Sequence, residues 1–128
     1  MKKKFLIVYA NYYQEISFGL LKSAKNLLPK NSTIKTISVP GVFEIPVTIS
    51  KNIKKYDGFI ALGCVIKGQT PHFEFISSSV TDNILNMSVK NKKPIGNGII
   101  TCLNKKQAIA RSTKGTEAAN AMLSVLSQ

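Results

Sequence analysis

The chain has 128 residues, and 44% of them are hydrophobic, which is enough for one domain of ordinary size. Its 19% charged residues and mean hydropathy of +0.04 exclude a disordered or collagen-like chain, and no apolar run approaches the ~20 residues that span a bilayer. Eighteen basic residues against six acidic ones give a formal net charge of +12.

All but one of the basic residues are lysines, the exception being Arg111. A charge of this size raises nucleic acid as a partner. The lysines, however, are scattered from Lys2 to Lys114 and rarely interleave with aromatic residues, and the many Ile and Asn residues point to AT-rich coding as another source of the bias. The sequence therefore does not favour a nucleic-acid partner. We single out Arg111, because lysine cannot copy a planar bidentate fork.

The amino-terminal segment starts with lysines and an apolar run, as a signal peptide does. The run stops at Ala10 and no small-residue cleavage pattern follows it, so we expect a cytoplasmic protein without a membrane span. Cys64 and Cys102 are too few for a disulfide framework or a zinc site, and we expect no metal. We interpret both as small core residues rather than nucleophiles.

Segments typical of strands and of helices alternate along the chain with short connections. Continuous apolar runs predict strands buried on both faces, mixed or glycine-containing segments predict edge strands, and apolar residues at helical spacing predict helices. In chain order these segments are a strand at 5–9, a helix with apolar residues from 16 to 28, an edge strand at 33–39, a helix at 44–54, a strand at 59–66, a helix from 71 with apolar residues to 87, an edge strand at 95–103, a helix at 105–112 that opens on an Asn104–Gln107 capping box, and a helix with apolar residues from 118 to 126.

Four strands that alternate with helices predict an α/β sandwich of three layers, with a parallel sheet covered by helices on both faces. The two most apolar strands, the first and the third, belong at the centre, so the predicted strand order is 2-1-3-4. No linker or internal repeat divides the chain, and residues 1–128 are expected to form a single domain.

Ligands of open parallel sheets bind beyond the carboxyl ends of the strands, where the strand order reverses. The loops at 11–13, 40–44 and 67–73 meet there and carry side chains that a simple turn does not need. Thr70 and Pro71 suit the first positions of a helix, which places His72 in its first turn. The positive end of the helix favours a neutral imidazole there, and such an imidazole suits a general base, although this lone histidine could instead cap the turn.

The same loops carry further candidate binding residues. Gly68 lets a ligand approach the backbone, whose amides suit a phosphate. Tyr12 and Phe43 could stack on a flat heterocycle or seal the core, and Glu44 could bond ligand hydroxyls or complement a helix dipole. The chain carries no G-x-G-x-x-G fingerprint, so a dinucleotide site is unsupported.

Three strings of residues together carry a resemblance. Residues 39–46 read VPGVFEIP, residues 61–74 read ALGCVIKGQTPHFE, and residues 114–119 read KGTEAA. In this order they closely resemble the 6,7-dimethyl-8-ribityllumazine synthase family, and the similarity runs from about residue 5 to 126. The resemblance implies a flavodoxin-like fold and the condensation of 5-amino-6-(D-ribitylamino)uracil with 3,4-dihydroxy-2-butanone 4-phosphate in riboflavin biosynthesis, with release of phosphate and water and without any cofactor.

The resemblance also implies roles for individual residues. It assigns proton transfer to His72, pyrimidine and ribityl binding to Tyr12, Val42, Phe43, Glu44, Val65, Ile66, Asn97 and Lys114, and binding of the phosphate ketone to Gly68, Gln69, Thr70 and Arg111. In the family the site lies between adjacent chains of a homopentamer, or of a multiple of pentamers, and Asn97, Arg111 and Lys114 come from the neighbour. Riboflavin synthase is a candidate partner protein. The chain departs from the family at Asn97, where Phe is usual, and at Tyr12, where Phe is commoner.

Two other functions remain open from the residues. One is a non-catalytic flavodoxin-like module that binds phosphate or a flavin, and the other is a basic nucleic-acid-binding protein. Formation of a lumazine and phosphate from the two substrates would favour the enzyme, whereas binding of DNA or RNA with a steep salt dependence would favour the last alternative.

Overall fold

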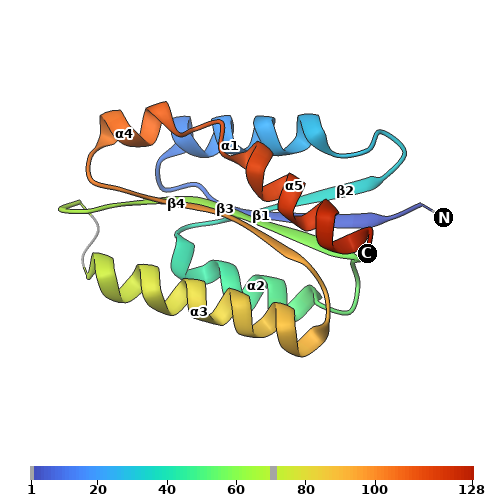
Figure 1. Cartoon of the computed structure of the whole chain (residues 1–128). Helices are drawn as coiled ribbons and strands as arrows, with labels where there is room; N and C mark the ends of the chain where they lie inside the picture. Colours follow the sequence, from blue (N-terminus) through green and yellow to red (C-terminus); the bar gives the residue numbers. More distant parts are fainter. Residues whose placement is uncertain (1, 70–71) are drawn as a thin grey trace.

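The computed structural model describes residues 2–69 and 72–128. Strands and helices alternate along the chain (Figure 1). In chain order the elements are β1 (Lys4–Ala10), α1 (Gln14–Leu27), β2 (Thr33–Val39), the short 3₁₀ helix η1 (Val42–Glu44), α2 (Ile45–Asn52), β3 (Gly58–Ile66), α3 (Phe73–Asn91), β4 (Ile95–Cys102), α4 (Lys105–Ala110) and α5 (Gly115–Leu126). The predicted succession of strands and helices is confirmed.

The strands form one parallel sheet in the order β2-β1-β3-β4. Every residue of β3 is buried, and so is the middle of β1, because these strands have a neighbour on each side and helices on both faces. Along β2 and β4, which form the edges of the sheet, exposed, half-buried and buried residues are mixed. The predicted strand order, with the apolar strands at the centre, is confirmed.

Helices cover both faces of the sheet, with α1, α4 and α5 on one face and α2 and α3 on the other (Figure 1). Because successive side chains of a strand point to opposite faces, Phe5 and Ile7 of β1 join a core cluster with α1 and α5, whereas Leu6 and Val8 join a second cluster with α2 and α3. The sheet therefore has a hydrophobic core on each side. In the part of the chain that is described, no helix is both long and apolar enough to cross a membrane.

The start of α4 carries the predicted capping interaction. The side-chain oxygen of Asn104 accepts a hydrogen bond from the backbone N–H of Gln107 at 2.8 Å, and the side-chain oxygen of Gln107 accepts one from the backbone N–H of Leu103 at 2.8 Å. The second bond reaches one residue further back than in an ordinary capping box. Both bonds fix the point at which the chain turns from β4 into α4.

The start of α3 differs from the prediction. The helix begins at Phe73, so the expectation that His72 lies in its first turn is wrong, and Thr70 and Pro71 lie outside the described residues. His72 immediately precedes the helix with φ 56° and ψ 42°, in the left-handed region, and its carbonyl oxygen accepts a hydrogen bond from the N–H of Ile76 at 2.9 Å. The helix therefore starts two residues after the predicted start at 71, although the backbone of His72 already accepts a bond from the first turn. Histidine is among the residues that tolerate this region better than most.

Gly96 of β4 lies directly against the backbone of α5. A Cβ atom at this position would be 2.1 Å from the carbonyl oxygen of Ala118, and this backbone oxygen cannot move without shifting α5. We predict that Gly96→Ala lowers the free energy of unfolding by roughly 1–3 kcal/mol or more, as overpacking does. Urea unfolding measures the effect, with Thr101→Ala, at an exposed position of the same strand, as the control. Equal stability of the two variants would contradict the close packing of α5 on β4.

Candidate active site

The carboxyl ends of all four strands lie at one edge of the sheet, on the left in Figure 1, and the strand order reverses between β1 and β3. The loops that leave β1, β2 and β3 surround a pocket of about 230 Å³, which we call the β1/β3 pocket. It is lined by Tyr12, Tyr13, Gly41, Val42, Phe43, Cys64, Val65, Gln69 and Ile76. Five of the predicted binding residues therefore share one concave surface, namely Tyr12, Val42, Phe43, Val65 and Gln69.

Hydrogen bonds hold the loops after β1 and β2 together. The backbone N–H of Asn11 donates to the carbonyl oxygen of Val39 at 2.9 Å, and its side-chain Nδ2 donates to Ser38 Oγ at 2.6 Å. The η1 turn that follows β2 buries Val42 against Gly63 of β3, where a Cβ atom would be 2.6 Å from Val42 Cγ1. This contact fixes the height of the loop above the sheet.

Two aromatic side chains at the rim of the pocket are exposed. The exposed fraction is 64% for Phe43 and 69% for Tyr12. The ring of Tyr12 packs edge to face on the ring of Tyr13, with centroids 4.9 Å apart and an interplanar angle of 87°. The rings of Phe43 and Tyr12 thus do not seal the core of this chain, and their faces are open to solvent.

The loop after β3 carries polar and glycine residues to the same rim. The N–H of Lys67 donates to the carbonyl oxygen of Cys102 at 2.9 Å, and the N–H of Gln69 donates to that of Ile66 at 3.1 Å. Between them Gly68 has φ 85°, and no atom of the described residues lies within 4 Å of the position of a Cβ there, so these residues leave its backbone open to a ligand. The exposed His72 follows in the same loop, past the undescribed Thr70.

Glu44 and Ile66 do not line the β1/β3 pocket. Glu44 lies beside Phe43 at one end of a groove of about 730 Å³ between α2 and α3. Its Oε1 atom lies 3.2 Å from the position of a Cβ at Gly41, so the carboxylate leans toward the loop after β2. Ile66 is fully buried in β3. Glu44 can meet a ligand that extends out of the pocket toward the groove, whereas Ile66 can contribute only its backbone.

The remaining predicted residues lie on a different surface, which we call the β4 groove. It has a volume of about 410 Å³ and is lined by Asn97, Gly98, Ile99, Ile100, Thr101, Arg111, Lys114 and Glu117. Consecutive residues of β4 line it, and β4 pairs only with β3, so the groove runs along the open edge of the sheet.

Hydrogen bonds and an ion pair position the polar side chains of the β4 groove. Arg111 follows the last turn of α4, and its Nη1 donates to the carbonyl oxygen of Thr101 at 3.1 Å. Lys114 Nζ lies 2.7 Å from Glu117 Oε2. Asn97 Oδ1 accepts a hydrogen bond from the backbone N–H of Ile99 at 3.0 Å, which leaves its Nδ2 donor directed elsewhere. Of the groups described here, the guanidinium of Arg111 is the one suited to a bidentate anion.

No described residue lines both the β1/β3 pocket and the β4 groove. The pocket offers aromatic faces and the loop of His72, while the groove offers the cations. One copy of the chain therefore presents the predicted site as two separate halves.

Cys64 lines the β1/β3 pocket, although the sequence assigned it to the core. Burial first, and then the charge and a hydrogen bond of Cys102, together raise the pKa of the Cys64 thiol from 9.0 to about 12. Both cysteines are buried and neither forms a disulfide. The thiol is thus neutral at physiological pH, and the prediction that Cys64 is not a nucleophile agrees with this environment.

The sequence analysis did not single out Tyr13 and Ile76 as pocket residues. Tyr13 lies within the loop at 11–13 that was expected at the site, and Ile76 lies in the first turn of α3, just beyond the expected loop at 67–73. Proximity to these loops was the available signal. The described residues contain no group of three or more His, Cys, Asp or Glu side chains that could hold a metal ion.

The chain is similar to known proteins over almost its full length. The model of the 6,7-dimethyl-8-ribityllumazine synthase family matches residues 2–128. A 6,7-dimethyl-8-ribityllumazine synthase of Bartonella tribocorum is 42% identical, over 98% of this chain and 91% of that protein. The enzyme of the same name from Agrobacterium fabrum is 38% identical, over 98% of this chain and 93% of its own length. A third relative, 6,7-dimethyl-8-ribityllumazine synthase 1 of Rhodopseudomonas palustris, is 40% identical over 94% of this chain.

The raised pKa of the Cys64 thiol predicts low reactivity. A shift from 9.0 to about 12 lowers the thiolate fraction at neutral pH about 1,000-fold. We expect a thiol-specific disulfide reagent to label the folded protein very slowly at about pH 8 and the chain unfolded in guanidinium chloride promptly. The variant Cys102→Ala isolates the Cys64 signal. Rapid labelling of this folded variant would contradict the burial of Cys64.

Proposed function

Because the chain belongs to the 6,7-dimethyl-8-ribityllumazine synthase family, we propose that its catalytic centre forms where the β1/β3 pocket of one copy meets the β4 groove of the next. The chain is a lumazine synthase of riboflavin biosynthesis. Its reaction joins 5-amino-6-(D-ribitylamino)uracil to 3,4-dihydroxy-2-butanone 4-phosphate and releases phosphate and water. Such a reaction needs a flat slot, an anion site and a group that moves protons, and much of its rate can come from holding two reactants together.

The separation of the two half-sites is the observation that carries this proposal. The aromatic rim belongs to the pocket, and the exposed His72 lies in the loop that brings Gln69 to it, whereas Arg111, Lys114 and Asn97 line the open edge of β4. A phosphate ketone held only by the β4 groove would lie outside the pocket of the same chain. A neighbouring copy whose β4 edge faces the pocket brings both sets of groups to one substrate pair, and a head-to-tail contact of this kind closes into a ring.

We assign the pyrimidine to the β1/β3 pocket. The exposed rings of Tyr12 and Phe43 flank a flat heterocycle, and the buried Val42 forms the floor with Val65. The backbone at Val65 and Ile66 reads the ring edge. The ribityl chain extends past Phe43 toward Glu44, whose carboxylate accepts hydrogen bonds from its hydroxyls.

We assign the phosphate of the second substrate to the loop after β3 and to Arg111 of the neighbouring copy. Gly68 leaves its backbone open, Gln69 reaches the pocket, and Thr70 lies next in the chain. The Arg111 guanidinium is anchored by one hydrogen bond to Thr101 and keeps a face for a phosphate. Lys114, held by Glu117, adds positive charge beside it.

In this arrangement His72 transfers protons. Imine formation, loss of phosphate, ring closure and loss of water each move a proton near the joined carbons, and His72 lies in the same loop as Gln69 of the pocket. Its left-handed conformation is a local backbone strain of the kind that is often found at functional sites. We therefore assign the general base to the loop that borders the β1/β3 pocket.

We propose that the assembly is a pentamer or a multiple of pentamers. The groove of about 730 Å³ between α2 and α3 is unfilled in one copy, and apolar side chains on these helices are exposed by 58% at Val47, 75% at Phe75 and 69% at Val89. A neighbouring copy would bury them. We also propose that residues 1–128 act as one domain in the cytoplasm, where the free cysteines fit a reducing compartment, and that riboflavin synthase is a partner.

A coupled assay tests the function directly. Purified protein, mixed with both substrates, should produce the absorbance of the lumazine and release one phosphate for each lumazine formed. A non-catalytic module of the same fold would bind a substrate without releasing phosphate.

Substitution of His72 should lower turnover. General acid–base groups contribute about 10²–10⁴ to a rate, and the chemistry of the bound amine and ketone leaves some activity, so we expect a loss of roughly 10- to 1,000-fold. His72→Asn is the better variant, because Asn also tolerates the left-handed backbone, and His72→Ala shows what the added strain does. A folded His72→Asn protein with full turnover would contradict the assignment of the base.

Substitution of Arg111 should affect one substrate. Arg111→Lys keeps the charge and loses the bidentate fork, so about 1–3 kcal/mol of binding should be lost. The apparent affinity for the phosphate ketone should weaken tenfold or more, while that for the pyrimidine changes little. Steady-state kinetics with each substrate varied in turn measure both values. Equal weakening for the two substrates would indicate damage to the subunit contact.

Asn97 stands where Phe is usual in the family. Because Asn cannot stack on the pyrimidine as Phe does, we predict that this chain binds the pyrimidine weakly. Asn97→Phe loses the bond from Ile99 and gains stacking worth about 0.5–1.5 kcal/mol, so the pyrimidine should bind several-fold more tightly. Isothermal titration of the pyrimidine compares the native chain, Asn97→Phe and Asn97→Ala. The affinity of Asn97→Ala shows the effect of losing the amide alone, so its difference from Asn97→Phe gives the effect of adding the ring. A weaker Phe variant with an unchanged assembly would show that the Asn97 amide bonds the ligand.

A further inference from the structure

The edge of the sheet opposite the candidate active site collects most of the net charge of the chain. The loops that enter the strands lie there with both chain termini, on the right in Figure 1. We define the basic edge by the lysines of these loops, of the amino-terminal segment and of the last helical turns: Lys2, Lys3, Lys4, Lys25, Lys30, Lys51, Lys54, Lys55, Lys90, Lys92 and Lys93. We propose that the basic edge binds the phosphate backbone of nucleic acid without reading its sequence.

The charge is distributed very unevenly between the two edges. Eleven lysines lie at the basic edge, together with one carboxylate, Asp57. The side chains of this edge therefore carry a net charge of +10, whereas the net charge of the whole chain is +12. The opposite edge is close to neutral, because it holds five basic residues and four glutamates. The basic residues are Lys67, Lys105, Lys106, Arg111 and Lys114, and the glutamates are Glu15, Glu44, Glu74 and Glu117. A compositional excess of lysine alone would not separate the carboxylates from the lysines in this way.

The lysines of the basic edge have almost no carboxylate partners. The ion pairs of the described residues, Lys67 with Glu74 and Lys114 with Glu117, both lie at the opposite edge. Asp57 accepts a hydrogen bond from the backbone N–H of Lys4 at 2.8 Å rather than from a lysine side chain. Because the charges are not neutralised internally, their field extends into solvent.

Stabilisation of helices accounts for a minority of these charges. Lys25, Lys51 and Lys90 lie in the last turns of α1, α2 and α3, where a cation offsets the negative end of the helix dipole. Lys93 donates to the carbonyl oxygen of Ile53 at 2.7 Å and joins two loops. The other lysines of the basic edge lie in loops or at the amino terminus, are exposed, and have no comparable structural role in the described residues.

The groups around the lysines favour a phosphate backbone over other anionic partners. Exposed Asn31 and Gln128 add neutral donors of the kind that bond phosphate oxygens. The one tyrosine of these loops, Tyr56, is half-buried and packs on Phe59 with ring centroids 6.1 Å apart, so it offers no platform for stacking bases. In the described residues the loops of this edge carry no large exposed apolar side chain that would insert into a membrane. The exposed Val89 and Val125 nearby lie in the last turns of α3 and α5. Backbone contact without base contact gives binding that is independent of sequence.

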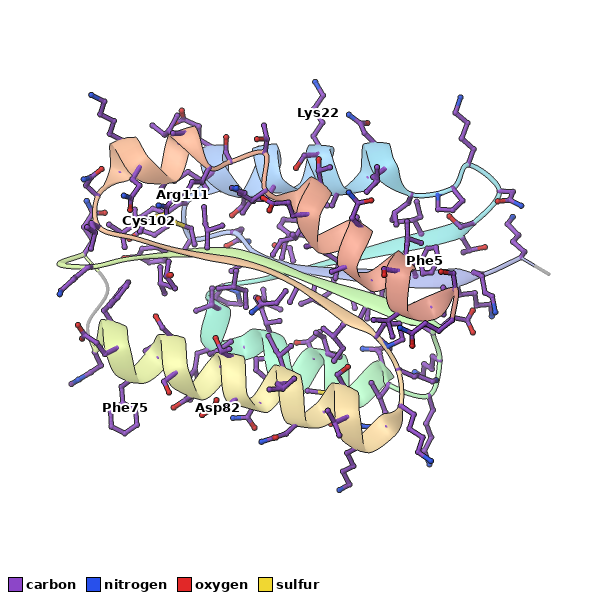
Figure 2. The ribbon with its side chains drawn as sticks, viewed as in Figure 1. Phe5, Lys22, Phe75, Asp82, Cys102 and Arg111 are labelled. Carbon is purple, nitrogen blue, oxygen red and sulfur yellow. The ribbon has the colours of Figure 1, made fainter. Side chains whose placement is uncertain are left out.

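Fluorescence anisotropy of a labelled 20-base-pair duplex of mixed sequence tests the proposal on the assembled protein. The edge variant is Lys30→Glu/Lys54→Glu/Lys55→Glu. The control variant is Lys22→Glu/Lys105→Glu/Lys106→Glu, which has the same net charge but changes lysines away from the basic edge; Lys22 projects from the outer face of α1 (Figure 2). Neither variant changes a residue of the proposed catalytic centre, so lumazine formation should persist in both and reports that the protein is intact.

We expect the native protein to bind the duplex with an affinity that falls steeply with salt, with a log–log slope of about −4 or steeper for five or more phosphate contacts. The edge variant should lose at least tenfold in affinity, and the control variant less than threefold, by the same phosphate-contact argument. An equal loss in the two variants would overturn the proposal, because the attraction would then come from net charge alone. Absence of binding at low salt, or binding of phosphatidylglycerol vesicles in place of the duplex, would also overturn it.

Discussion

The parallel pairing of β1 with β3 is the constraint on which the rest of the molecule depends. Both strands are buried along most of their length, because each has a neighbouring strand on either side and helices above and below. Parallel pairing places every strand exit at one edge of the sheet and every strand entry at the other. The chemistry-bearing loops therefore gather at the exits, while the lysine-rich returns gather at the entries. The parallel arrangement of the strands thus accounts both for the position of the candidate site and for the separation of charge between the two edges.

The same sheet also explains why a single copy does not hold the whole of the catalytic centre that we propose. β4 is an edge strand, and the groups that recognise an anion lie along its open side, on Arg111 and Lys114. The aromatic rim lies above β1 and β3, at the point where the strand order reverses. Folding can align these groups within each half, through bonds such as that from Arg111 to Thr101, but only association of two copies can unite the halves. The catalytic centre that we propose therefore forms only when copies of the chain assemble.

Much of the fold and part of the site could be predicted from the sequence. The apolar runs at 5–9 and 59–66 determine which strands are central, and the spacing of Asn104 and Gln107 marks the start of α4. The left-handed backbone of His72 could not be predicted, because it depends on the path that the loop takes between β3 and α3 and not on local propensity. The placement of Glu44 in the α2/α3 groove depends likewise on the η1 turn. Lysines that look scattered in the sequence share one edge only after the crossovers have formed.

Complementation between two defective variants tests the shared catalytic centre most directly. His72→Asn damages the pocket half and Arg111→Ala the groove half, and the two chains can be unfolded, mixed in equal amounts and refolded together. A centre shared by adjacent copies in a head-to-tail ring predicts recovery of about a quarter of the native activity, because random mixing restores that fraction of intact sites. The control is the same mixture without unfolding. Activity after joint refolding that equals the sum of the two separate variants would show that each copy contains its whole site, and would contradict the account.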